Sequence, residues 1–406
     1  MLDFSQVATQ LKFLSSQQFD QRERLSLALN EAGMRFTASC ESWEKVQAKV
    51  RNSETSWLVA EWFASPEAAL PAPAPPKQSI VFAADGSQIV SDRHDIALIY
   101  LLNVGFVTLR YGTNERATLS SEPVIAPPDA ELLNEDEGAS SPISPGRLAQ
   151  RRTLAELKGL AALIEKEAVN SAENLPSLAL TDGTLIMWQV ENEEPIYRNR
   201  FLTEFQACLK RARDLRVPIA GYVSSPMSRD VVNSLRVSVC PKLRAACDTF
   251  CPTRPGQKKH IEVIERPYCA GTEFVTDADL FRTVLKPGQR SVLFGCRSKV
   301  LSTEAYEEDN KILFFYLNSG REIARIEIPQ WVAEDPVMLE LTHSLCYDQS
   351  QKGDGYPVAL AEAHEQAIVR GADRAALFQL VQRDMATERV LIRTTRKSLS
   401  KQARRV

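Results

Sequence analysis

Two apolar runs in this chain end in the same short acidic sequence, and this repetition limits most strongly how the chain can fold. The segment 79–90, SIVFAADGSQIV, has an apolar run followed by Asp85-Gly86-Ser87. The segment 178–185, LALTDGTL, repeats the pattern around Asp182. Short apolar runs bounded by turn residues are typical of buried strands. Two such strands could direct two carboxylates at one point, although a single Asp-Gly is more often a turn than a site.

Composition excludes several classes of protein. The chain has 406 residues, of which 44% are hydrophobic, which suggests about two domains or one large domain with an appendage. No apolar run approaches the roughly 20 residues of a membrane span. The N-terminus lacks a basic region followed by a long apolar one, so we expect no secretory signal and a cytoplasmic protein whose eight cysteines are reduced.

The predicted organisation has four parts. Residues 1–70 have helical periodicity and form an N-terminal helical region, within which Trp57–Phe63 is expected to be a short helix. A Pro/Ala-rich linker follows at 71–78 and leads into the main domain, 79–388. A basic tail, 389–406, ends the chain; because the net charge is only −3, this tail is a local feature that could attract DNA or an acidic partner, or be a solvated end.

Within the main domain, strands come first and then alternate with helices. The first strand is expected to end at Asp85, and 96–111 should form one or two more strands, with Gly105 as a candidate bulge. A long amphipathic helix is predicted at 147–169, before the second Asp-Gly strand. Further helix and strand patterns follow, and 236–290 has no regular pattern. This order predicts an α/β fold with a mixed sheet flanked by helices.

The acidic residues of these elements could form a metal site. Asp85 and Asp182 end two strands, the intervening helix carries Glu156 and Glu165, and His364 lies on a late helix. This order of elements is that of the RNase H-like fold. Oxygen ligands with one imidazole suit Mg²⁺ or Mn²⁺ rather than Zn²⁺. Two such ions can activate a water and stabilise the leaving oxygen of a phosphodiester.

The ordered set of motifs resembles the NurA nuclease family. The segments that carry the resemblance, spread over about residues 75–385, are AADGSQ, LALTDGTL, AGYVSSPMSRDVVNSLR and GDGYPVALAEAHEQA. The resemblance implies an RNase H-like fold, Mn²⁺- or Mg²⁺-dependent processing of DNA ends, and a homodimer that docks on a hexameric HerA-type ATPase translocase. It also implies Asp85 and Asp182 as metal ligands, with Tyr356 and His364 at the active site, where His364 would ligate the second metal or donate a proton. For the helix ligand we prefer Glu156 to Glu165.

Other interpretations remain open. The scaffold could lack metal chemistry and serve as a nucleic-acid-binding or assembly module, or it could cleave RNA. A zinc site is disfavoured because the candidate ligands lack close Cys-x2-Cys pairs; these candidates are Cys240, Cys247, Cys251, His260 and Cys269. Arg229 or Arg236 could contact a DNA backbone. Neither GxGxxG nor GxxxxGK[ST] occurs, so ATP-driven movement would depend on a partner.

Overall fold

The computed structural model describes residues 3–55, 57–90, 99–126, 144–170, 175–247, 268–302 and 306–387. The basic tail 389–406, Cys251 and His260 therefore lie outside the described residues. The chain divides into two compact units, each assembled from separated segments. Unit 1 consists of residues 1–73, 222–303 and 311–336, and unit 2 of residues 74–221, 304–310 and 337–406.

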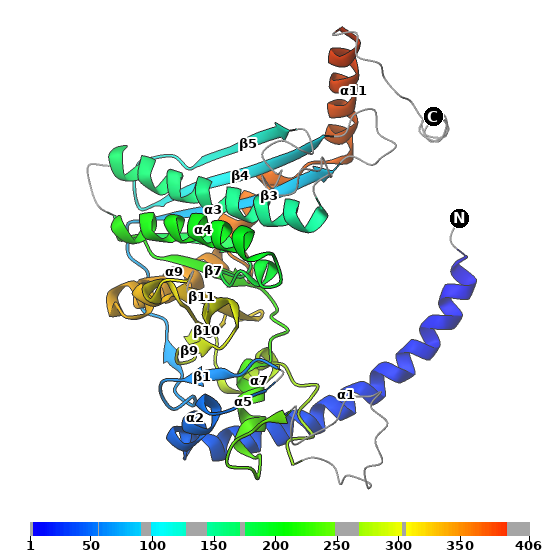
Figure 1. Cartoon of the computed structure of the whole chain (residues 1–406), viewed down its shortest axis with the longest axis vertical. Helices are drawn as coiled ribbons and strands as arrows, with labels where there is room; N and C mark the ends of the chain where they lie inside the picture. Colours follow the sequence, from blue (N-terminus) through cyan, green and yellow to red (C-terminus); the bar gives the residue numbers. More distant parts are fainter. Residues whose placement is uncertain are drawn as a thin grey trace. The chain divides into compact units, whose positions relative to one another are not determined.

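The sheet of unit 2 has the strand arrangement of an RNase H-like fold (Figure 1). Its strands lie in the order β5-β4-β3-β6-β7. β4 pairs antiparallel with both β3 and β5, and β6 then pairs with β3 in parallel. The strands are β3 (Ser79–Val90), β4 (Tyr100–Tyr111), β5 (Thr118–Ala126), β6 (Ser177–Asp182) and β7 (Ile219–Val223), the last two residues of β7 being assigned to unit 1.

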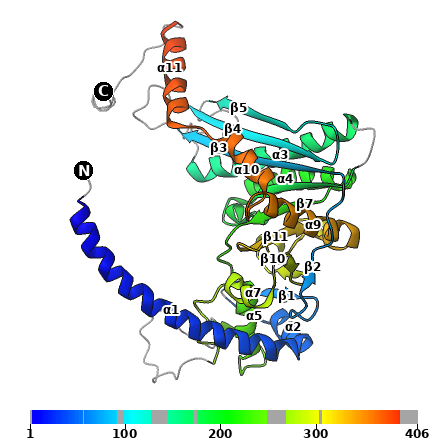
Figure 2. The same cartoon turned by 180° about the vertical axis from the view of Figure 1, so that it is seen from behind.

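Helices cover both faces of this sheet, which explains why its central strands are continuous apolar runs. Helices α3 (Pro145–Asn170) and α4 (Pro195–Asp214) lie on one face (Figure 1). Helix α10 (Val358–Ala367) lies on the other face, against β3 and β4 (Figure 2). Side chains on both faces of a covered strand are buried, so an alternating polar pattern is not expected. Accordingly, Val81 to Ala84 of β3 and Leu178 to Leu180 of β6 are at most 1% exposed.

Two further helices of unit 2 flank α10 in the chain. Helix α9 (Pro336–Lys352) precedes it, with only Pro336 assigned to unit 1. Helix α11 (Gly371–Thr387) follows it. Among the described residues, no helix is both long enough and apolar enough to cross a membrane.

Unit 1 packs the N-terminal helices against a small antiparallel sheet of strand order β1-β9-β10-β11. One apolar core joins helix residues such as Ala32 and Val50 to strand residues such as Trp62, Phe294 and Phe314. The elements are α1 (Phe4–Cys40), α2 (Trp43–Arg51), β1 (Ala60–Trp62), β2 (Leu70–Pro71), α5 (Asp230–Ser238), α7 (Asp277–Val284), β8 (Gln289–Arg290), β9 (Phe294–Cys296), β10 (Ile312–Asn318), β11 (Ile323–Pro329) and α8 (Gln330–Ala333).

Three local expectations are wrong. The helix expected at Trp57–Phe63 is absent, and this segment instead contains β1, because Trp62 pairs with Phe294 of a strand far along the chain. The stretch 236–290 is expected from its sequence to be irregular, but it contains helix α7. No bulge occurs at Gly105, which pairs in unbroken register with Asp85. The sequence predicts four parts of the chain that differ in their folding. The two compact units are a division in space and do not test it, so the four-part division stays a prediction.

Candidate active site

Asp85 and Asp182 reach the same part of unit 2 because their strands are parallel neighbours. The paired register of β3 and β6 runs up to Ala84 and Thr181, and each aspartate is the next residue. Asp182 is the last residue of β6, and Gly183 after it has a φ of +98°, which favours glycine. Asp85, by contrast, does not end its strand, which continues to Val90. The expectation that Asp85 lies at a strand end is therefore wrong.

Each residue of the sequence Asp85-Gly86-Ser87 serves a different neighbour, because side chains alternate between the faces of a strand. Asp85 Oδ2 lies 2.7 Å from Nδ1 of His364 on α10. The Ser87 hydroxyl, on the same face, donates to the Ala367 carbonyl at the end of α10. Gly86 is placed toward α3 on the opposite face. The motif is thus a strand segment that holds two helices, and not a turn.

The position of the Glu156 carboxylate on α3 depends on the absence of a side chain at Gly86. A Cβ atom at residue 86 would lie 2.4 Å from Glu156 Oε1 and 2.8 Å from Cγ of Arg152. Real Cβ atoms do not approach other atoms so closely, so any other residue at position 86 would require this carboxylate to shift from its present place. Glu156 is only 9% exposed, and its Oε1 is among the buried atoms that have no hydrogen-bond partner. Its charge is compensated by Arg152, whose Nε lies 3.2 Å from Oε1.

Helix α10 approaches the other face through a second glycine. Gly105 of β4 is the register partner of Asp85. A Cβ atom at residue 105 would lie 2.4 Å from the Ala363 carbonyl oxygen and 2.6 Å from the Ala367 backbone nitrogen. The side-chain amide of Asn103 also donates to the Ala367 carbonyl, at 2.9 Å. This close contact brings His364 to Asp85.

Tyr356 lies in the turn before α10 and donates a hydrogen bond to Asp182. Two consecutive residues ahead of it, Asp354 and Gly355, have positive φ angles of 54° and 111°. Such angles are uncommon outside glycine, so this turn is a defined feature of the backbone. The five residues Asp85, Glu156, Asp182, Tyr356 and His364 thus lie in one unit, around the end of β6.

Burial and mutual repulsion change the acidity of this group. Burial raises the pKa of Glu156 to about 7; Arg152 opposes the rise, while the charges of Asp85 and Asp182 add to it. Burial also raises the pKa of Asp182, against the hydrogen bond from Tyr356. A low-dielectric setting disfavours a charged carboxylate unless a positive group compensates it. The site therefore favours bound positive charge.

The donor set is chemically suited to a hard divalent cation. Three carboxylates and one imidazole supply mainly oxygen ligands, which suit Mg²⁺ or Mn²⁺. The Glu156 Oε1 atom without a hydrogen bond is one oxygen that a cation would satisfy. Among the described residues, however, no three His, Cys, Asp or Glu side chains are grouped as a ready metal site. Each carboxylate is instead paired with a protein group: Asp85 with His364, Glu156 with Arg152, and Asp182 with Tyr356.

Other candidates from the sequence lie elsewhere. Glu165, the alternative helix ligand, is half exposed and pairs with Arg211 at 3.5 Å. Arg229 and Arg236 belong to unit 1, where Arg229 donates to the Glu273 carbonyl and Arg236 stacks 4.4 Å from the ring of Trp57. The described cysteines of the disfavoured zinc set, Cys240, Cys247 and Cys269, are free thiols.

Sequence patterns gave no role in the site to three residues that shape it: Arg152, Gly86 and Gly105. The roles of the glycines depend on how closely two helices approach, which local sequence does not record. For Arg152, the spacing to Glu156 is a usable signal, because residues four apart on a helix are neighbours.

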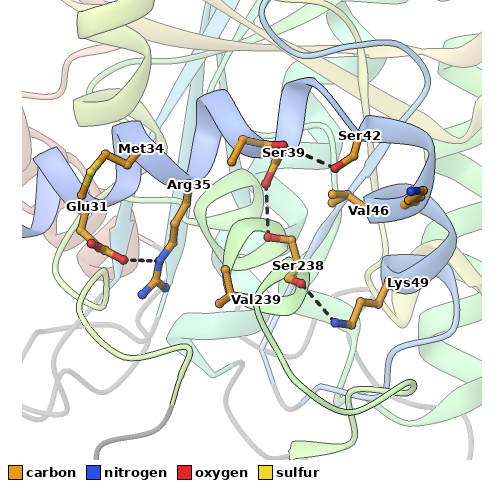
Figure 3. Close-up of a pocket in the computed structure, with 11 residues that line it drawn as sticks. Glu31, Met34, Arg35, Ser39, Ser42, Val46, Lys49, Ser238 and Val239 are labelled. Carbon is orange, nitrogen blue, oxygen red and sulfur yellow. Dashed lines mark hydrogen bonds and ion pairs between the residues drawn. The ribbon is translucent and has the colours of Figure 1, made fainter.

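A separate pocket lies in unit 1 between α1, α2 and the end of α5 (Figure 3). Its volume is about 670 Å³, and Arg35 and Lys49 are among the residues that line it. Both cations already serve the protein: Arg35 pairs with Glu31 and donates to the Ala270 carbonyl, and Lys49 donates to the Ser238 carbonyl. We assign this pocket no function.

Comparison with known proteins identifies the family. The model of the NurA domain matches residues 79–369, a range that contains all five residues of the site and most of the chain. No curated protein matches.

Solved structures show weaker likenesses. The NurA nuclease from Sulfolobus solfataricus is 13% identical, with a TM-score of 0.49, over 96% of this chain and 98% of that one. A structure of NurA with manganese is 16% identical, with a TM-score of 0.38, over 85% of this chain and 98% of that one. The catalytic domain of human endonuclease V is 13% identical, with a TM-score of 0.34, over 85% and 98% of the two chains. These likenesses are too weak to transfer details, whereas the domain match covers well over half of the sequence. The chain therefore belongs to the NurA family of nucleases.

Proposed function

We propose that this protein is a divalent-metal-dependent DNA nuclease that hydrolyses phosphodiester bonds at DNA ends with two ions, Mn²⁺ or Mg²⁺. The observation that carries the proposal is the meeting of three carboxylates from β3, α3 and β6 beside His364 and Tyr356. Bound ions would supply an activated water and stabilise the leaving oxygen. Asp85, Glu156, Asp182 and His364 are the residues that would hold them.

The protein side chains have distinct tasks in this proposal. Asp85 has its Oδ1 atom held by the Gly86 backbone N–H at 2.8 Å, which fixes the direction of its carboxylate. The His364 side chain is 61% exposed, whereas that of Asp85 is 15% exposed. His364 can therefore reach substrate while one ring nitrogen stays on Asp85, and its other nitrogen could either hold the second ion or give a proton to the leaving oxygen. The Tyr356 hydroxyl can donate to the scissile phosphate.

The partners in this proposal are DNA, a second copy of the chain and a hexameric HerA-type translocase, in the cytoplasm, with a role in repair or defence. Family membership supports all of them. The lack of a nucleotide-binding motif in the sequence further supports a separate ATPase.

The test is cleavage of end-labelled linear DNA, single- and double-stranded, with Mn²⁺, Mg²⁺ or EDTA. We expect metal-dependent cleavage that is lost in Asp182→Asn. Asp309→Asn is the control, because Asp309 is a half-exposed aspartate of unit 2 that pairs with Arg213. Equal activity of the wild type and Asp182→Asn would contradict the proposal. If the wild type is inactive alone, the assay is repeated with the translocase, and light scattering measures the dimer.

A second candidate is a nucleic-acid-binding or assembly module without catalysis. The pairing of each carboxylate with a protein group favours it, since no ready metal cluster is present among the described residues. It predicts that DNA binding persists in Asp182→Asn and that neither form cleaves DNA or RNA with any metal or partner. Calorimetric detection of Mn²⁺ binding by the wild type, lost in Asp182→Asn, would contradict it.

A further inference from the structure

Arg152 is a permanently charged group beside the acidic residues of the site, and the mechanism above gives it no task. Its Nε lies 3.2 Å from Glu156 Oε1, and its positive charge also acts on Asp182. Its Cγ lies over Gly86, next to the carboxylate of Glu156. Gly86 therefore leaves room for both members of the pair.

Helix stability does not explain this pair. An arginine placed four residues before a glutamate is the less favourable order for an ion pair on a helix. The Arg152 side chain is 36% exposed, whereas that of Glu156 is 12% exposed. An ion pair with one deeply buried partner requires good geometry to offset the cost of desolvation. The ion pair therefore acts on the buried carboxylate of Glu156 and is not an ordinary surface pair that stabilises helix α3.

We propose that Arg152 is a positioning residue whose guanidinium attracts the Glu156 carboxylate and keeps it directed at a divalent cation. This inference rests on the proposed function, in which Glu156 is a ligand. Within the described part of the chain, neither Arg152 Nε nor Glu156 Oε1 has a hydrogen-bond partner, so the guanidinium would act through its permanent charge, which attracts the carboxylate from 3.2 Å. Groups that orient ligating carboxylates commonly contribute 10- to 100-fold to metal affinity.

The alternative role for Arg152 is simple charge compensation, and the two roles predict opposite effects. If the guanidinium only reduced the negative charge of the site, its removal would strengthen the attraction for a cation. If it orients Glu156, its removal would weaken cation binding even though a repelling positive charge is lost. The direction of the change in Mn²⁺ affinity therefore distinguishes the roles.

The experiment is a calorimetric titration of the full-length protein with Mn²⁺ alone. We expect Arg152→Gln to bind Mn²⁺ roughly 10- to 100-fold more weakly than the wild type. The matched control is Arg200→Gln on α4, since Arg200 also precedes its partner Glu204 by four residues but is 75% exposed. An unchanged or tighter affinity in Arg152→Gln, or an equal loss in the control, would overturn the proposal.

A double-mutant cycle with Glu156→Gln tests whether Arg152 acts through Glu156. If it does, Arg152→Gln adds no further loss of affinity in the Glu156→Gln background, whereas a full additional loss overturns the proposal. Thermal unfolding in EDTA accompanies each variant, so that a folding defect is recognised. If the wild type binds no Mn²⁺, the proposed function itself fails; if the wild type binds and Arg152→Gln is unchanged, only this inference fails.

Discussion

Gly86 contributes no functional group, yet the position of Glu156 depends on it. A methyl group at residue 86 would overlap the Glu156 carboxylate, which is the movable end of a side chain, and it would also press on Arg152. We therefore expect Gly86→Ala to displace the carboxylate and to reduce Mn²⁺ affinity and cleavage by at least about tenfold. Titration and DNA cleavage check this. Wild-type behaviour of the variant would show that the carboxylate can move without consequence.

Gly105→Ala is the informative counterpart, because its Cβ would meet backbone atoms of α10 that cannot turn away. We expect this variant to lose about 1–3 kcal/mol of unfolding free energy, the usual cost of overpacking. Urea denaturation measures the loss. A stability equal to that of the wild type would mean that α10 sits less tightly on β4 than described.

Glu156 makes stability depend on pH in a defined direction. Its pKa is about 7 in the folded protein and 4.5 in an ordinary glutamate, so between these values the folded chain keeps a proton that the unfolded chain has lost. Stability in EDTA should therefore fall as pH rises through this interval, by up to about 3 kcal/mol. Denaturation at pH 5 and pH 8 tests this prediction.

The control for the pH prediction is Glu156→Gln, which should show a smaller fall in stability than the wild type. Burial and the neighbouring charge of Asp230 raise the pKa of Asp277 in unit 1 to about 7 as well. Its contribution has the same sign and is common to both proteins, so the difference between them isolates Glu156. Parallel pH profiles would contradict the assignment.

The sequence indicated the polar residues that the structure brings together more readily than the residues that support them. Asp85 and Asp182 follow apolar runs, and Tyr356 and His364 stand in a recognisable motif. The roles of Gly105 and Arg152 depend instead on tertiary packing, namely a helix that touches a strand and a cation that touches a buried carboxylate.

At the scale of elements, α10 and α11 should differ sharply in protection. Helix α10 buries Ala359, Leu360 and Ala363 at no more than 1% exposure, whereas Leu380 of α11 is 49% exposed. Isolated helices of this length are marginal in water. We expect the amides of α11 to exchange hydrogen much faster than those of α10, as mass spectrometry of peptides can measure. Equal protection would reveal a partner on α11.

Long helices were predicted well from sequence because their apolar periodicity is local. Short elements were not. Strand β1 depends on pairing with β9, which is more than 200 residues away in the chain. Helix α7 did carry a local signal, the capping box between Thr276 and Asp279, which the surrounding irregular pattern obscured.

At the scale of the whole molecule, unit 1 cannot be assembled without the N-terminal segment. Ala32, Val50 and Trp62 are fully buried in the same core as Leu280 and Phe294. Removal of residues 1–73 should therefore leave unit 1 unfolded and sensitive to limited proteolysis. If residues 1–70 are instead an independent helical region, the shortened chain will keep its full protease resistance.

Removal of residues 1–20 is the control for this truncation. Phe4, Leu11 and Leu14 in that stretch are exposed, at 74%, 55% and 48%, and the buried residues of the unit 1 core begin at Ala28. The melting temperature of this shorter deletion should stay within a few degrees of the wild type.

The two glycines that let α3 and α10 approach the sheet have a consequence for engineering this protein. In a saturation library screened for cleavage, positions 86 and 105 should rank among the least permissive, beside the charged residues themselves. Measuring the amount of each variant protein would then distinguish the two positions. Variants at 86 would accumulate as intact but inactive protein, whereas variants at 105 would be degraded. Two positions without side chains would then report separately on chemistry and on folding.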